Sequence, residues 1–109
     1  MRGGYDLEIK DIQRWCRQAK IKWYKHALER MQERDISRED VKNCIMNAEI
    51  IEDYPDDFPH PSCLIFGYTV NKKVIHAVVS MDDENIGIIT VYFPNRDKFE
   101  DDLKTRKGC

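Results

Sequence analysis

The sequence lacks the short motifs that mark most familiar catalytic and metal-binding sites. Its 4 cysteines form no C-x-x-C pair, which argues against a zinc ribbon and against a thioredoxin-like redox site. It also contains no P-loop, no G-x-S-x-G and no H-E-x-x-H motif, so phosphate-loop nucleotide hydrolases, serine esterases and zincins are excluded. We therefore expect neither a metal ion nor a cofactor.

Long apolar runs are also absent. Cys63–Phe66 is among the longest, far below the roughly 18 residues that cross a bilayer, and the first residues lack the apolar core of a secretory signal. With 41% hydrophobic and 35% charged residues, the sequence predicts one globular domain over 1–109, with disordered tails at 1–5 and 106–109. We expect a cytoplasmic protein without membrane contact. Its cysteines should be free thiols, and three of them are predicted core residues: Cys16, Cys44 and Cys63.

The net charge of −2 is unlike the strongly basic balance of dedicated nucleic-acid binders. The charge is uneven, however, because residues 1–48 carry 11 basic against 8 acidic side chains, whereas residues 49–109 carry 7 against 12. Basic side chains of the first half could attract phosphates and so steer RNA toward the protein. The residues predicted for this steering role are Lys10, Arg14, Arg17 and Lys25.

The first half of the sequence has helical periodicity. Apolar residues recur at helical spacing over about 6–19 and again over about 25–34, with a short extended or capping segment, Ile21–Tyr24, between them. A third helix is indicated by the S-x-x-D capping box Ser37–Asp40, after which apolar residues again share one face.

After residue 47 the period changes to two, which predicts strands. We expect them at about 50–54, 62–70, 73–81 and 86–93, with a stiff proline loop over 55–61 and a short helix or tail over 95–106. Helices followed by strands predict an α+β fold, with two to three N-terminal helices on one face of a four-stranded, mainly antiparallel sheet.

The alternation of these strands predicts which side chains face the helices. The expected inward set is Leu64, Phe66, Tyr68, Val70, Ile75, Ala77, Val79, Met81, Ile89, Val91 and Phe93. The opposite face then carries His76, Val78, Ile88, Thr90 and Tyr92. This second face is more apolar and aromatic than a merely solvated surface, so it is a candidate binding surface.

His26, Arg30 and Arg34 recur every four residues, so one stripe of the second helix carries all three. A guanidinium fits phosphate oxygens and an imidazole titrates near neutrality, which together suit binding and proton transfer at a phosphodiester. Alternatively, nearby acidic side chains bind these arginines and tie the helix to the loop. The candidates for that structural role are Glu49, Glu52, Asp53, Asp56 and Asp57.

His76 and Tyr92 complete the candidate catalytic set, because an imidazole and a phenol near a guanidinium supply the proton donors that RNA cleavage requires. The alternative interpretation makes His76 a hydrogen-bonded wall residue and Tyr92 a packed aromatic.

Several of these segments resemble a bacterial and archaeal family, the domain of unknown function 4258. The resemblance rests on Ile21–Trp23, on K-H-A-L-E-R-M from Lys25, on E-I-I-E-D-Y-P-D-D from Glu49, on H-A-V-V from His76 and on I-T-V-Y from Ile89, and it extends to about Thr105. The family is similar in pattern to the RelE/ParE-like toxins, which have about two helices followed by a curled antiparallel sheet.

The resemblance implies the toxin of a toxin–antitoxin pair, a metal-independent endoribonuclease that cleaves RNA such as ribosome-bound mRNA. A small zinc-binding antitoxin of the MqsA type would be its partner. In this hypothesis Arg30 and Arg34 hold the phosphate, while His26 or His76 exchanges protons. The alternative is a non-catalytic protein-binding module of the same fold, and an open sheet edge leaves room for a homodimer.

Overall fold

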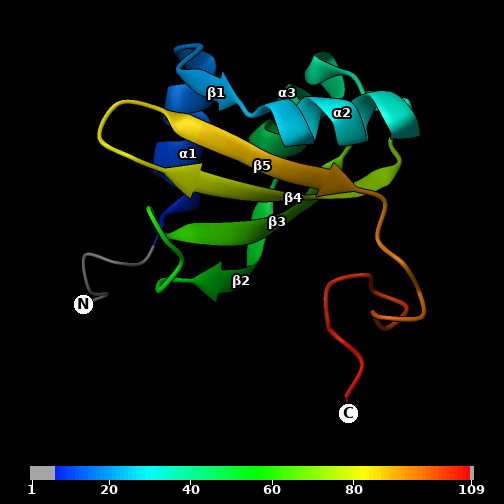
Figure 1. Cartoon of the computed structure of the whole chain (residues 1–109). Helices are drawn as coiled ribbons and strands as arrows, with labels where there is room; N and C mark the ends of the chain where they lie inside the picture. The colour runs from blue at the N-terminus through cyan, green and yellow to red at the C-terminus, as the bar shows by residue number, and fades with distance from the viewer. Residues whose placement is uncertain (1–6, 109) are drawn as a thin grey trace.

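The computed structural model describes residues 7–108 as three helices and one five-stranded sheet (Figure 1). In chain order the elements are α1 (Ile9–Arg17), β1 (Ile21–Trp23), α2 (Lys25–Arg34), α3 (Arg38–Met46), β2 (Glu49–Tyr54), β3 (Ser62–Tyr68), β4 (Val74–Met81) and β5 (Ile86–Tyr92). The strand order is β1-β5-β4-β3-β2, with β1 parallel to β5 and the other neighbours antiparallel.

The α+β class and the helices-first order are confirmed. The prediction of four strands is wrong, because the extended segment after α1 pairs with β5 as a fifth strand, Ile21 opposite Ile86 and Trp23 opposite Ile88. The sheet is therefore mixed rather than antiparallel throughout. None of the helices within residues 7–108 is both long and apolar enough to span a membrane.

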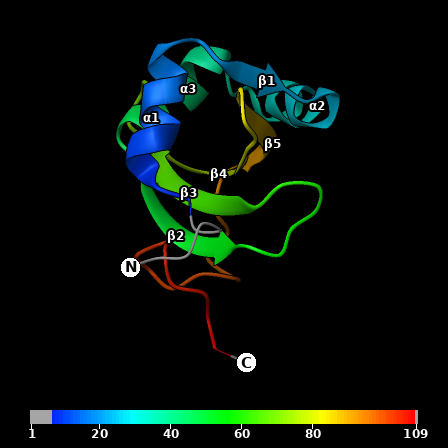
Figure 2. The same cartoon turned by 90° about the vertical axis from the view of Figure 1, so that its left-hand side faces the viewer.

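The helices cover one face of the curved sheet, and the C-terminal segment lies on the other side (Figure 2). The bounds predicted for α2 are those observed, and this helix ends at Asp35, whose φ of 57° is left-handed. The capping box of α3 is confirmed: Ser37 Oγ accepts from the Asp40 amide at 3.0 Å, and Asp40 Oδ2 accepts from the Ser37 amide at 3.0 Å. α1 is shorter than predicted and ends at Arg17.

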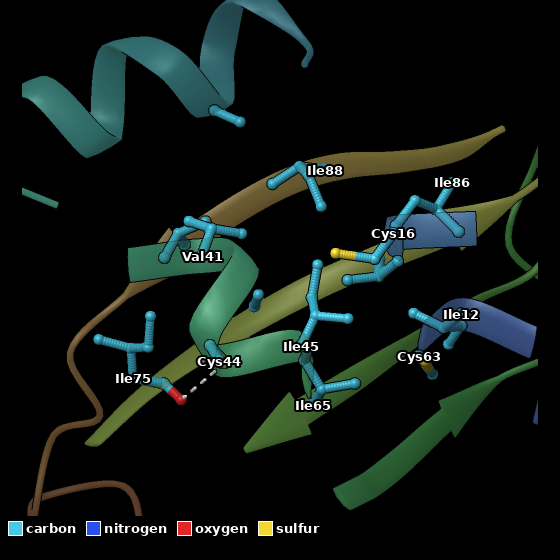
Figure 3. Close-up of a cluster of buried hydrophobic side chains, with 14 of the residues drawn as sticks. Ile12, Cys16, Val41, Cys44, Ile45, Cys63, Ile65, Ile75, Ile86 and Ile88 are labelled. Atoms are coloured by element: carbon cyan, nitrogen blue, oxygen red, sulfur yellow. Dashed lines mark hydrogen bonds between the residues drawn. The ribbon is translucent and has the colours of Figure 1, made fainter. Parts of the chain in front are cut away.

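The core fills the space between the helices and the sheet (Figure 3). The cysteine prediction is confirmed for Cys16, Cys44 and Cys63, which are all buried. The Cys44 thiol donates to the Ile75 carbonyl at 4.0 Å, and burial raises the pKa of Cys44 and of Cys63 to about 12. These thiols are structural, since few thiolates form at such pKa values. Cys109 lies outside the described residues.

The inward set predicted for β3 is wrong by one residue. Phe66 pairs with His76 and Ile65 pairs with Ala77, so Cys63 and Ile65 face the helices while Phe66 faces the other side. The alternation could not reveal this, because β3 is buried along both faces except at its last residue.

The register of β5 shifts at a bulge. Val79 pairs with Ile88 whereas Val78 pairs with Thr90, which leaves Ile89 as the extra residue. Ile88, expected to face outward, is therefore in the core, and Ile89, expected inward, is exposed. Beyond the bulge the predicted face is restored.

Residues 95–108 form turns rather than the helix considered for this region. Phe99 is 2% exposed and forms an isolated β-bridge with Arg106, so the predicted tail is in contact with the domain at its first residue. The other predicted tail, residues 1–5, lies outside the described residues.

Candidate functional site

A polar cluster lies on the outward face of the sheet, beneath the C-terminal segment. β4 and β5 place His76 opposite Tyr92 in the antiparallel register. β2 adds Glu52 and Tyr54, two residues apart and therefore on one face. The C-terminal segment adds Arg106, whose Nε lies 2.7 Å from Oε2 of Glu52. Residues from β2, β4, β5 and the C-terminal segment, up to 54 positions apart in the sequence, converge here.

His76 is fully buried, at 0% exposure, and both of its ring nitrogens have partners. Nε2 lies 2.6 Å from the Leu103 carbonyl oxygen, which can only accept, so Nε2 carries the proton. Nδ1 is then the acceptor, and the Tyr92 hydroxyl, 3.3 Å away, is the donor. Burial lowers the pKa of His76 and outweighs the opposing effect of the Leu103 hydrogen bond, so the imidazole is neutral at pH 7.

The Leu103 carbonyl is presented by a turn that holds an uncommon backbone conformation. Leu103 has a φ of 58°, in the left-handed region that costs a leucine roughly 1–2 kcal/mol. The turn is supported by Asp102 Oδ1, which accepts from the amides of Lys104 at 2.9 Å and Thr105 at 3.0 Å. Phe99 closes the other side, its ring edge-to-face with His76 at 4.7 Å between centroids.

Glu52 is the charged partner in this cluster. The Tyr54 hydroxyl donates to Glu52 Oε1, and Arg106 donates to Oε2. Desolvation alone would raise the pKa of Glu52, but these two hydrogen bonds outweigh it and hold the pKa below its usual value. Burial, with the Glu52 carboxylate, raises the pKa of Tyr54 to about 12. The Glu52–Arg106 pair thus ties β2 to the C-terminal segment.

A pocket of about 360 Å³ opens beside this cluster, which we call the cationic pocket. Its lining is Arg34, Tyr92, Phe93, Asn95, Lys98, Phe99 and Arg106. Three of these side chains are cations and none is acidic, so the pocket favours an anion. Burial is the main cause of a raised pKa at Tyr92, which keeps the phenol protonated and able to donate to His76.

The structure brings three of the five predicted catalytic residues together, namely Arg34, His76 and Tyr92. Arg34 is the last residue of α2, and its Nη1 donates to the Val91 carbonyl at 3.3 Å. This contact holds the guanidinium at the end of β5, one residue from Tyr92. His76 reaches the pocket only through Tyr92, because it is itself buried.

His26 and Arg30 are not part of this cluster. Arg30 pairs with Glu33 at 3.0 Å on the surface of α2. His26 lies eight residues before Arg34, about 12 Å along the helix at 1.5 Å per residue, and lines a different pocket. The three residues therefore share one stripe of α2, but the two ends of this stripe line different pockets.

The residues predicted to steer RNA are all exposed, on α1 and at the first residue of α2. Arg14 pairs with Asp11 at 3.1 Å. α1 and α2 lie at opposite sides of the helical layer (Figures 1 and 2). None of these four residues lines the cationic pocket.

Two of the acidic side chains that were expected to bind the arginines of α2 bind other cations instead. Glu49 pairs with Lys104 at 2.6 Å and Glu52 pairs with Arg106, so these acids bind the C-terminal segment. The sequence analysis did not include Tyr54, Lys98 or Arg106 in the site. Alternation along β2 would have placed Tyr54 with Glu52, but no periodic signal marks the irregular segment that carries Lys98 and Arg106.

Within residues 7–108, no group of three or more His, Cys, Asp or Glu side chains is placed to hold a metal ion. The sequence profile of the family described as Domain of unknown function (DUF4258) matches residues 23–93. The chain belongs to this family. The DUF4258 match contains Arg34, His76 and Tyr92, whereas α1 and the C-terminal segment lie outside it. No curated protein and no solved structure matches the chain.

Proposed function

We propose that the chain is a metal-independent endoribonuclease of the RelE/ParE-like type, the toxin of a toxin–antitoxin pair. The observation that carries this proposal is the Tyr92–His76 hydrogen bond at the wall of a pocket lined by cations. Guanidinium and ammonium groups suit a phosphodiester, and a phenol paired with an imidazole suits proton transfer. Helices followed by a curled meander of four antiparallel strands are in keeping with the RelE-like order.

The ribose 2′-hydroxyl is the nucleophile in this reaction. Its oxygen attacks phosphorus and the bond to the 5′ oxygen breaks, which leaves a 2′,3′-cyclic phosphate and a 5′-hydroxyl. The 2′ proton passes to the Tyr92 oxygen while the proton of Tyr92 passes to Nδ1 of His76, and solvent protonates the 5′ oxygen. His76 then releases its proton through Tyr92 to solvent, which replaces the proton that solvent gave to the 5′ oxygen and restores the starting state. Tyr92 is the catalytic residue and His76 a positioning residue.

Arg34, Lys98 and Arg106 supply the positive charge of the pocket. Charge builds up on the phosphoryl oxygens in the transition state, where fixed donors stabilise it more than they stabilise the bound substrate. Arg34 is the best placed of the three, because its guanidinium is anchored on a backbone carbonyl and not on an acid. Arg106 is already partly neutralised by Glu52.

The test is RNA cleavage in the presence of EDTA, with and without ribosomes, together with growth after induced expression. We expect cleavage and growth arrest with the wild type, and a loss of cleavage of about 10²- to 10⁴-fold in Tyr92→Phe. Tyr68→Phe is the matched control, since Tyr68 contacts Phe66 and does not line the cationic pocket. A wild-type chain that neither arrests growth nor cleaves RNA overturns the proposal.

The second candidate is a non-catalytic protein-binding module. It is supported by β2, which ends the strand order, so that its outer edge has no neighbouring strand within residues 7–108. A partner strand can add to such an edge. Co-purification of a small zinc-binding partner with both wild type and Tyr92→Phe, without RNA cleavage by either, would favour this function.

A further inference from the structure

A second pocket, of about 370 Å³, lies at the opposite end of α2 from Arg34. We call it the aromatic pocket, because four of the residues that line it carry flat rings: Tyr24, His26, Phe58 and His60. Ile89, the bulge residue of β5, and Ser80 of β4 contribute to its floor. Its volume is within the range of roughly 300–1,000 Å³ found for ligand pockets.

Phe58 is the most unusual residue of this pocket, because its side chain is 95% exposed. The loop that carries it is fixed at its base, where the Ser62 hydroxyl donates to Asp57 Oδ2 at 2.5 Å and the Asp57 amide donates to the Tyr54 carbonyl at 3.2 Å. The base of the loop is thus fixed, and the ring of Phe58 lies exposed beside the pocket. Exposed apolar groups that gather in one place mark interaction sites, and Phe58 shares this pocket with Ile89, which is also exposed.

Tyr24 also lines the aromatic pocket, and its position depends on a glycine. A Cβ atom at Gly87 would lie 2.7 Å from Cε2 of Tyr24, so only glycine lets this ring lie against β5. The Lys22 ammonium lies 4.9 Å from the centroid of the same ring, which places a cation at the rim. The ring is therefore a fixed aromatic surface beside a positive charge.

We propose that the aromatic pocket binds a nucleobase of single-stranded RNA, which rests on the proposed function and extends it to the substrate. A base has a flat π-face for the rings of Phe58 and Tyr24, and polar edges that imidazole nitrogens and the Ser80 hydroxyl can meet. Stacking of this kind is how proteins hold unpaired bases without a requirement for one sequence. The Asp57 carboxylate lines the pocket, so a phosphate group alone does not fit it.

The relative position of the two pockets suits one RNA strand. α2 and β5 run side by side in the same direction and connect them (Figure 1). Ile89 precedes Tyr92 by three residues, about 10 Å along a strand, and His26 precedes Arg34 by about 12 Å along the helix. Stacked nucleotides rise about 3.4 Å each, so roughly three of them cover this span. A phosphate in the cationic pocket and a base in the aromatic pocket can belong to one strand.

The test uses the three histidines as reporters in proton NMR of the full-length protein, assigned with single His→Gln variants. Adenosine monophosphate and uridine monophosphate should shift the ring signals of His26 and His60, whereas ribose 5-phosphate and inorganic phosphate should not. Phe58→Ala should weaken nucleotide binding about 10-fold. Tyr68→Ala is the matched control, because Tyr68 is an exposed aromatic residue that lines neither the aromatic nor the cationic pocket.

Two outcomes overturn the inference: no shift with either nucleotide, or equal shifts with ribose 5-phosphate. Shifts caused only by a phenylalanine-containing peptide would assign the pocket to protein binding and also overturn it. The proposed function fails separately, when wild-type RNA cleavage is absent although nucleotides shift His26 and His60. Where cleavage occurs, Phe58→Ala should raise KM and Tyr92→Phe should lower kcat.

Discussion

The carbonyl oxygen of Leu103 lies 2.6 Å from Nε2 of His76 and thereby determines which ring nitrogen of this buried histidine carries its proton. The other nitrogen is left to accept from Tyr92. A backbone group of the C-terminal segment therefore orients the phenol of a pocket to which the same segment contributes Asn95, Lys98, Phe99 and Arg106. Residues 95–108 lie outside the DUF4258 match, yet they complete the hydrogen bonding of a histidine within it.

His76 should make the stability of the domain depend on pH. In the unfolded chain this histidine binds a proton as the pH falls through about 6.5, whereas burial lowers its pKa in the folded chain. The unfolded state then binds more protons, so the free energy of unfolding should be fully retained above pH 6.5 and fall as the pH decreases toward the folded pKa. Urea denaturation at pH 7.5 and 5.5 measures this.

The pH effect has a direct control in the other histidines. His76→Gln should lose this part of the pH dependence, although it is less stable at every pH, while His26→Gln, at an exposed position, should keep the wild-type dependence. Equal slopes for wild type and His76→Gln would contradict the assignment of a neutral buried imidazole.

Phe99 should hold the C-terminal segment on the sheet. Its ring is 2% exposed and packs on His76, so Phe99→Ala should lower the free energy of unfolding by up to about 3 kcal/mol and open the cover of the histidine. Faster exchange of the His76 Nε2 proton, observed by NMR, would report the opening. The comparison is Phe58→Ala, which removes a ring that is 95% exposed and should change stability by less than about 0.5 kcal/mol.

Arg34 and Arg30 should differ in RNA binding although they are one helical turn apart. Arg34 lines the cationic pocket, so Arg34→Ala should weaken binding of a non-cleavable RNA and reduce the slope of log affinity against log salt by about 1. Arg30 is paired with Glu33, so Arg30→Ala should change the slope little. The RNA affinity of each variant, measured at four salt concentrations, gives these slopes. Identical slopes for the two variants would show that Arg34 is not part of the phosphate site.

Gly67 should be intolerant of any side chain. A Cβ atom at this position would lie 2.5 Å from the Cys44 carbonyl oxygen and 2.7 Å from its Sγ. Since the carbonyl belongs to α3, Gly67→Ala must push the helix from β3, at a cost of about 1–3 kcal/mol in thermal or urea unfolding. Gly108→Ala, where a Cβ would meet nothing within 4 Å, should be neutral. A wild-type melting temperature for Gly67→Ala would show that α3 can move.

Local signals predicted the helices well. The capping box at Ser37 and Asp40 is a self-contained pattern, and the bounds of α2 follow from its apolar spacing. The pairing of β1 was missed, although an extended segment was considered there, because three residues carry little periodicity and their partner, β5, lies more than sixty positions away. The register of β3 was missed because the C-terminal segment covers the face that would otherwise be solvated, so both faces became apolar.

The candidate site was predicted in part for similar reasons. Residue type and the alternation of side chains along β4 and β5 were enough to place His76 and Tyr92 together on one face of the sheet. The packing of α2 beside β5 brings Arg34 to them. Arg106 could not be found, because its role depends on how an irregular segment returns to the sheet. Nothing short of the tertiary fold places it beside Glu52.

The additional residue at Ile89 decides more than the local shape of β5. With an uninterrupted register, continuing the pairing of Val79 with Ile88, His76 would stand opposite Val91 and Tyr92 would point under the helices. An isopropyl group would then replace the phenol beside the imidazole. Tyr92 is therefore beside the imidazole only because Ile89 is left out of the pairing, and a change that drew Ile89 into regular pairing with Val78 would turn the proton donor away without altering any residue of the site.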